Sequence, residues 1–358
     1  EMFPAFDVGV LGEGEETLGE LIKALESGED INGVKGIVFR SAEGIKLNGP
    51  RPFIENMDKL PFPAWDLLPS LAKSYRPAVI NYKRLPATSL VTSRGCPGNC
   101  AFCDTKVFGT RYRIHSAGYV LKMIDHLKDN HGINDICFYD DVFTIFKQRL
   151  IDICGGLKEK RHKISWSCQA RVNSVDYETL KMMKESGCWK VSFGIESGSD
   201  DILRLMNKHI VADRSKKAIE DAKRAGLEVE GYFILGFFGE TKETLEKTKK
   251  FIAESSLDTI LLSYFLPFPG SPAYAHIKEY GRFEEDWRKM NVFDKPQFIP
   301  AGISAEDMVD AQNEIYRNFY FRPKMFAKYA WKMIRNPGSA LRMAKSSIGL
   351  TNFVFKNG

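Results

Sequence analysis

Short apolar runs alternate with amphipathic segments through the middle of the chain. The apolar runs have the length of buried strands and begin near residues 88, 134, 164, 189, 229 and 258. Between them, apolar residues recur at helical spacing, as in Leu150, Cys154 and Leu157. Ser116 and Asp176, ahead of two such segments, are residue types that begin helices. The pattern therefore predicts six strand–helix units in succession.

Six units in about 200 residues predict parallel strands that curve into an incomplete barrel, because a closed barrel of eight units usually needs about 250. We therefore predict an α/β fold whose main domain, residues 87–285, is a partial (β/α)6 barrel of the TIM type. After it, residues 286–358 predict a helical, basic extension that includes a helix over 305–320.

The first 56 residues predict a separate small unit. It contains a strand at 8–11, a helix over about 16–26 and a hairpin between 36 and 47. A proline-rich segment, 57–86, links this unit to the barrel. Because the chain begins with Glu and enters an apolar strand almost at once, we interpret it as a fragment that lacks an upstream part.

Composition restricts the compartment and the partners. Seven cysteines, three of them in one short segment, do not suggest a disulfide framework and indicate a reducing, cytoplasmic location. No run of 18 apolar residues is present to span a bilayer. Residues 321–358 hold eight Lys or Arg and no acidic residue, so the net charge of +5 belongs to the tail. A body without a broad basic face is not expected to bind nucleic acid.

Cys96, Cys100 and Cys103 form the pattern C-x3-C-x2-C directly after the first barrel strand. Strand ends at this mouth of a barrel carry the chemistry of such folds. Thiolates favour soft metals and iron–sulfur clusters, whereas a structural zinc site would need a fourth ligand. The next cysteine is Cys137, far along the chain. Three ligands would leave one iron of a cubane cluster open to a substrate.

The cysteine segment C-P-G-N-C-A-F-C resembles that of the radical S-adenosylmethionine (SAM) superfamily. The resemblance extends over about residues 5–290, because G-E-G-E-E-T near residue 12 and P-F-P-A-W-D-L-L-P in the linker are similar to the class that carries a cobalamin-binding domain before the barrel. It implies that Cys96, Cys100 and Cys103 ligate a 4Fe–4S cluster, and that Phe102 lies alongside the adenine of SAM.

The resemblance also implies SAM contacts at the ends of the later strands. Asp140 or Asp141 would meet the amino group, although this sequence departs from the family's Gly-Gly-Glu and the alternative is a helix cap. Arg171 would hold the methionine carboxylate. Ser192 and Glu196 would lie near the ribose and the methionyl end. The adenine side would be formed by two segments that contain Ile234, Gly236 and Leu266.

Residues 1–56 resemble the end of a Rossmann-like cobalamin-binding domain. No Asp-x-His-x-x-Gly sequence, whose His binds cobalt in many such domains, is present. We therefore expect cobalamin only in a full-length protein, where the His could lie upstream or the corrinoid could bind without it. The alternative for residues 1–56 is a small structural cap.

The resemblance implies an enzyme that cleaves SAM reductively to methionine and a 5′-deoxyadenosyl radical, which takes a hydrogen atom from a small-molecule substrate. A reducing partner such as flavodoxin or ferredoxin would supply the electron. The expected outcome is cobalamin-dependent methylation of an unactivated carbon, and the first alternative is anaerobic oxidative cyclisation of a porphyrin-like substrate. The second alternative is an iron–sulfur or zinc protein with a binding role and no catalysis.

Beyond residue 322, Met325, Tyr329 and Met333 fall on one face of a predicted helix, with lysines alongside. This helix either packs on the barrel, which we favour, or makes a weak contact with an anionic membrane surface.

Overall fold

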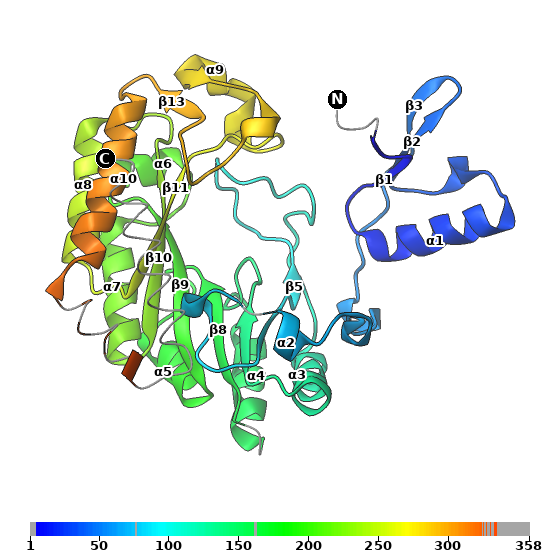
Figure 1. The fold of residues 1–358 in the computed structure, drawn as a ribbon, viewed down its shortest axis with the longest axis horizontal. Helices are drawn as coiled ribbons and strands as arrows, with labels where there is room; N and C mark the ends of the chain where they lie inside the picture. The colour runs from blue at the N-terminus through cyan, green and yellow to red at the C-terminus, as the bar shows by residue number, and fades with distance from the viewer. Residues whose placement is uncertain are drawn as a thin grey trace.

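The main body is a parallel sheet of six strands that curves as an incomplete barrel. The computed structural model describes residues 5–75, 77–160 and 163–323, together with 325, 327, 330, 333 and 334. All neighbouring strands of the main sheet pair in parallel. The strands lie side by side in the order β11-β10-β9-β8-β7-β4 (Figure 1). The predicted α/β partial barrel is confirmed.

The sheet strands begin close to the predicted positions. They are β4 (Ala87–Leu90), β7 (Asp135–Phe138), β8 (Ser165–Ala170), β9 (Cys188–Glu196), β10 (Glu228–Leu235) and β11 (Thr259–Tyr264). Between β4 and β7 the chain also forms β5 (Ser93–Arg94) and β6 (Arg113–Ile114), which pair antiparallel with each other. This short ladder closes the segment that carries the three cysteines.

Helices cross over on the convex face of the sheet (Figure 1). They are α3 (Ala117–His131), α4 (Lys147–Glu159), α5 (Tyr177–Glu185), α7 (Ala212–Arg224) and α8 (Lys242–Glu254). The short α6 (Asp200–Leu205) instead packs its Ile202 into a separate apolar cluster with Phe237 and Phe265. The side chains of Ser116 and Asp176 cap α3 and α5, as predicted. The apolar stripes of the larger helices and the outward residues of the strands share one core, which includes Phe138, Trp166 and Phe193.

The two faces of the sheet differ because side chains alternate along a strand. On β9, Val191, Phe193 and Ile195 enter the helix-covered core. The opposite, concave face carries polar or small residues, among them Lys190 and Ser192 of the same strand. A face of this kind leaves space and polar groups toward the centre of the partial barrel.

The N-terminal unit is a three-stranded sheet beside one helix. It comprises β1 (Val8–Val10), α1 (Gly14–Ser27), β2 (Ile37–Ser41) and β3 (Gly44–Leu47). The predicted strand, helix and hairpin are present, but both strand pairs are antiparallel. A parallel doubly wound core would pair differently, so the unit corresponds at most to the antiparallel edge that many such sheets carry. In Figure 1 it lies to one side of the barrel.

The linker contains the one-turn helix α2 (Leu71–Ser74), and after the barrel come α9 (Ile277–Tyr280), β12 (Gly281–Phe283), β13 (Phe298–Pro300) and α10 (Ala305–Tyr320). Helix α10 has the predicted bounds and borders the edge strand β11. The hydroxyls of Tyr316 and Tyr320 accept hydrogen bonds from the backbone of Leu262 and Ile260, both at 3.1 Å. These bonds satisfy edge N–H groups that would otherwise need water or another strand.

The predicted tail helix falls largely outside the described residues. Of its apolar face, Met325 is buried in the main core and Ile334 is exposed. Within the described ranges, no helix combines the length and apolar character needed to cross a membrane.

Candidate active site at the mouth of the barrel

The three cysteines lie in the loop between β5 and β6, at the carboxyl end of β4. All three are free thiols, with Cys100 buried, Cys96 half-buried and Cys103 at the loop surface. The backbone of Cys96 donates to Gly109 O at 3.4 Å, across the base of the loop. Gly95 has φ of +84°, and a Cβ there would lie 2.4 Å from Arg111 O. The loop therefore folds back tightly at its first residue, as only glycine permits.

The donor set fits an iron–sulfur cluster better than a single ion. In the part of the chain that the structure describes, no three His, Cys, Asp or Glu side chains converge closely enough to hold one metal ion. In a cluster each thiolate binds a different iron, so the sulfurs need not meet at one point. A Cβ at Gly98 would lie 3.4 Å from Cys96 Sγ and 3.8 Å from Cys100 Sγ. Glycine thus keeps the space between two of the sulfurs open.

The thiol of Cys103 is electrostatically disfavoured as a thiolate when no metal is bound. Desolvation of the thiol, together with the nearby Cys100 and Cys96, raises the pKa of Cys103 to about 11. Lys208 acts in the opposite direction. Neighbouring thiolates repel one another unless cations lie between them, and a bound metal deprotonates its thiol ligands.

Arg171 follows β8 directly and lies against the cysteine loop. Its Nη2 donates to Lys208 O at 2.8 Å, and Nη1 would be 2.6 Å from a Cβ at Gly98. Its Nε is buried without a hydrogen-bond partner. The side chain therefore faces the loop rather than the outer wall, with one donor unused.

Glu196 ends β9 with a left-handed φ of +69°. This turn sends its carboxylate to Lys208, whose Nζ lies 2.6 Å from Glu196 Oε1, and both side chains are buried. The Lys208 Nζ is 5.6 Å from the ring centroid of Phe102, within the range of a cation–π contact. Lys208 thus joins Glu196 to the cysteine loop. No sequence pattern marks Lys208, because it follows a helix and not a strand.

The two candidate aspartates have different surroundings. Asp140 is fully buried and accepts bonds from the backbone N of Thr92 at 2.6 Å and from the hydroxyls of Thr92 and Ser93 at 2.7 and 2.6 Å. Arg149 Nη1 is 3.9 Å away. Asp140 therefore fixes the base of the cysteine loop, and both of its carboxylate oxygens are buried and engaged there.

Asp141, in contrast, is exposed, and its carboxylate has no hydrogen-bond or ion-pair partner among the described residues. Partial burial, and after it the charge of Asp140, raise the pKa of Asp141 above its usual value. It lies near enough to Cys103 to raise the pKa of that thiol as well. A ligand ammonium group could compensate its charge at this position.

The remaining predicted residues divide between two environments. Phe102 and Ile234 pack against a small apolar cluster that includes Phe237 and Phe265, and Leu266 is buried. Ser192, however, donates to Glu230 Oε2 at 2.7 Å, an oxygen that Lys190 also contacts at 3.1 Å. The Ser192 hydroxyl is therefore engaged within the barrel.

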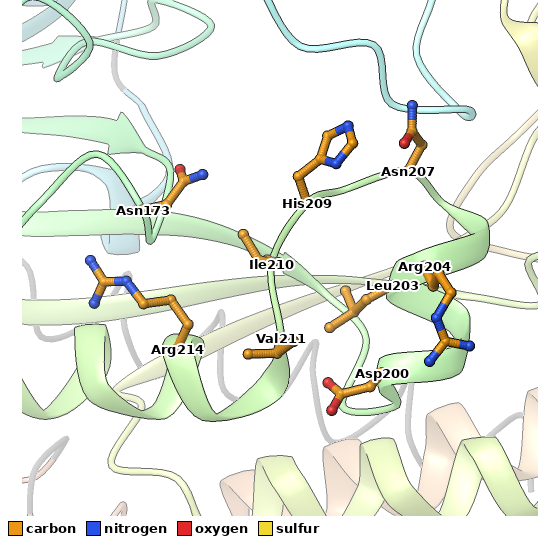
Figure 2. Close-up of a pocket in the computed structure, with 9 residues that line it drawn as sticks. All are labelled: Asn173, Asp200, Leu203, Arg204, Asn207, His209, Ile210, Val211 and Arg214. Atoms are coloured by element: carbon orange, nitrogen blue, oxygen red, sulfur yellow. The ribbon is translucent and has the colours of Figure 1, made fainter.

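A cavity of about 660 Å³ lies beside the site, between α6, α7 and the segment that joins them. Figure 2 shows its lining residues: Asn173, Asp200, Leu203, Arg204, Asn207, His209, Ile210, Val211 and Arg214. Two of them reach the cysteine loop, since Asn207 Nδ2 donates to Asn99 O at 3.0 Å and His209 Nε2 is 3.3 Å from Asn99 Oδ1. Asn207 and His209 both have positive φ. This segment therefore contacts the cysteine loop through Asn99.

Gly236 and Glu240 form the turn after β10. Gly236 has φ of +77°, and its N–H donates to Glu240 Oε2 at 3.2 Å, while Thr244 Oγ1 donates to Glu240 Oε1 at 2.6 Å. Burial raises the pKa of Glu240 from 4.5 to about 7. The turn beside the predicted adenine segment therefore contains a carboxyl group that changes charge near neutral pH.

The comparisons with known proteins agree with this geometry. A sequence model of the Radical SAM superfamily matches residues 90–252. An uncharacterized methyltransferase of Pyrococcus horikoshii is 37% identical over 91% of this chain and 70% of its own length. The anaerobic magnesium-protoporphyrin IX monomethyl ester cyclase of Cereibacter sphaeroides is 30% identical over 93% of this chain.

Among solved structures, the cobalamin-dependent SAM radical enzyme OxsB, with aqua-cobalamin and SAM bound, superposes with a TM-score of 0.69 at 19% identity and covers 92% of this chain. This similarity concerns the fold alone. The chain spans 54% of the cyclase and 55% of OxsB, so it corresponds to about half of each.

Titration of Glu240 is expected to affect stability. Its folded-state pKa is raised, so the folded chain retains a proton that the unfolded chain releases. The stabilisation that comes from protonated Glu240 is complete below about pH 4.5 and is lost as the pH rises through about 7. The loss amounts to a few kcal/mol, since one pKa unit corresponds to about 1.4 kcal/mol. In Glu240→Gln, the free energy of unfolding should therefore fall less between about pH 5 and pH 8 than in the wild type.

Urea unfolding at several pH values measures this slope. Glu246→Gln, which changes an exposed carboxylate on α8, the helix that follows Glu240, is the control and should keep the wild-type slope. Parallel slopes for Glu240→Gln and wild type would show that Glu240 does not titrate as described.

Proposed function

The chain belongs to the radical SAM superfamily and is an enzyme, and on this premise we propose that Cys96, Cys100 and Cys103 hold a 4Fe–4S cluster at which SAM is cleaved. One observation carries the proposal: three free cysteines share a loop that is closed by its own ladder at the carboxyl mouth of a six-stranded partial barrel. Three ligands leave one iron with a position for SAM.

When bound, the cluster would supply the single electron needed for reductive cleavage of the C5′–S bond of SAM; the products would be methionine and a 5′-deoxyadenosyl radical, which would take a hydrogen atom from the substrate. The residues of the chain bind and orient SAM. Arg171, with its unused buried Nε, and Lys208 place positive charge beside the loop for the methionine carboxylate. Asp141 is the carboxylate for the amino group, since Asp140 is fully engaged.

The adenine would lie on the apolar side of the mouth. Phe102 and Ile234 both pack against the apolar cluster there, and Leu266, just after β11, is buried. Gly236 would contact the adenine by its backbone; its own space on the other side is filled by α10, where a Cβ would lie 2.3 Å from Met308 Sδ. Glu196 acts by holding Lys208, and Ser192 by holding Glu230. The apolar walls would exclude water from the reacting carbon.

For the whole protein, the proposed reaction is cobalamin-dependent methylation of a small molecule, with electrons from a flavodoxin or ferredoxin. The methyltransferase relative, matched over 70% of its length, supports this choice. Helix α1 also exposes an apolar stripe of Leu18, Ile22 and Leu25, on the side away from its own sheet. Such a stripe is consistent with residues 1–56 being part of a larger cobalamin domain. Oxidative cyclisation is the second candidate, favoured by the cyclase that matches 93% of this chain.

Replacing any one of the three cysteines tests the proposed function. Cys100→Ala, for example, should not retain the wild-type iron and sulfide content after anaerobic reconstitution and should not release 5′-deoxyadenosine from SAM in dithionite. Cys154→Ala is the matched control, because Cys154 is equally buried but lies in α4 within the helix–sheet core. It should lose stability, about 1–3 kcal/mol for a small buried group, and keep the cluster. SAM cleavage by Cys100→Ala at the wild-type rate would rule out the assignment.

The neighbouring aspartates provide a second test. Asp141→Asn should weaken SAM binding by roughly 1.5–3 kcal/mol, the range for a hydrogen bond to a charged group, and leave the unfolding free energy nearly unchanged. Asp140→Asn should instead lower the unfolding free energy by about 3–5 kcal/mol, because it leaves Arg149 buried beside a neutral group. Anaerobic calorimetry and urea unfolding measure the two effects. Unchanged SAM affinity in Asp141→Asn would remove this residue from the site.

A further inference from the structure

The cysteine loop begins and ends in the short β5–β6 ladder, Ser93–Arg94 and Arg113–Ile114, which we call the neck. Two arginines lie directly opposite each other in it. In the β5–β6 ladder, Ser93 pairs with Ile114 and Arg94 with Arg113. Like charges at directly opposed positions of an antiparallel pair destabilise it. Arg113 is also buried, which makes an unpaired charge there costly. A ladder of only two residues on each side therefore needs an anion to hold it closed.

That anion comes from the N-terminal unit. Glu13 is 7% exposed and accepts from Arg94 Nη1 at 2.9 Å and from Arg113 Nη1 at 2.7 and 2.8 Å on its two oxygens. The backbone N of Ile54 in the following segment donates to Glu13 Oε2 at 2.7 Å. One carboxylate thus joins both sides of the neck to the N-terminal unit and to the chain that leaves it.

Arg113 extends this contact into the loop itself. Its Nη2 donates to Phe108 O at 3.0 Å, and its Nη1 donates to Ile54 O at 2.9 Å. Its guanidinium lies 4.6 Å from the ring centroid of Phe53. Because Arg94 is two residues before Cys96 and Phe108 is five residues after Cys103, a change at Glu13 reaches both sides of the cysteine segment.

We propose that Glu13 is a positioning residue for the cysteine loop: it neutralises the opposed arginines, holds the neck closed and so sets the geometry in which the three sulfurs meet the cluster. This inference rests on the proposed function for the identity of the cluster. It assigns to the N-terminal unit a role at the barrel site that does not depend on corrinoid binding. Glu13 stands at the N-cap position of α1, and Glu15 in the first turn of that helix also contacts Arg94, so movement of α1 is transmitted to the neck through these two carboxylates.

Glu13→Gln in the full chain tests the proposal by two measurements. Hydrogen exchange of the metal-free chain should show the amides of residues 93–96 and 113–114 exchanging about tenfold faster or more, since a charged partner has been lost. In the reconstituted chain, iron should be lost to a chelator faster than from wild type, and the electron paramagnetic resonance spectrum of the reduced cluster should change.

Asp258→Asn is the matched control. Asp258 is a buried carboxylate outside the loop that accepts from Val229 N at 2.8 Å and from Lys223 Nζ at 2.6 Å. The Asp258→Asn variant should have a lower melting temperature. Its hydrogen exchange at the neck, its iron retention and the spectrum of its reduced cluster should stay as in wild type. If Glu13→Gln does not yield folded chain, Glu13→Asp, which keeps the charge but shortens the side chain away from the two arginines, should show the same changes at smaller size.

The outcomes separate the two proposals. If wild type takes up no cluster, the proposed function fails, and neck exchange in the metal-free variants still decides the role of Glu13. If Glu13→Gln loses stability as Asp258→Asn does, while neck exchange and iron retention stay at wild-type values, Glu13 is a structural residue only and the inference is wrong.

Discussion

Charges buried in a protein must be paired, and around the cysteine loop three such pairings determine where the sulfurs lie. Asp140, with Arg149 close by, holds Thr92 and Ser93 at the base of the loop. Glu13 joins the two arginines at the neck. Glu196 holds Lys208 at the mouth. Glu13 is distant in sequence from both arginines, so this pairing forms only when the barrel and the N-terminal unit are both folded.

The parallel sheet explains why these groups meet at all. The carboxyl ends of parallel strands lie at one edge, and β4, β7, β8 and β9 deliver the cysteine loop, Asp141, Arg171 and Glu196 to that edge. The polar concave face below it leaves space that the helix-covered face does not. The same scaffold is shared with proteins described as methyltransferases and as cyclases. The fold therefore does not by itself distinguish between these two classes of relative.

Hydrophobic periodicity predicted the six strands, their succession along the chain and helix α10. A strand buried on both faces and a helix buried along one stripe each leave a regular pattern of apolar residues. The periodicity did not separate Asp140 from Asp141, since β7 ends at Phe138, before both of them, and alternation no longer applies there. No periodic pattern marked Lys208, because the residues on either side of it, at 207 and 209, have left-handed backbone and belong to neither a helix nor a strand. The pairing of Glu13 with Arg113 spans 100 residues and could not be inferred from local pattern. The antiparallel pairing of β1 with β2 likewise depends on a tertiary arrangement.

Mössbauer spectroscopy of the anaerobically reconstituted, iron-57-labelled chain, recorded with and without SAM, tests the central claim most directly. Three cysteine ligands predict a 4Fe–4S cluster in which one iron differs from the other three and changes its isomer shift when SAM is added. A spectrum of isolated tetrahedral iron, or a cluster whose four irons are all unchanged by SAM, would contradict the account.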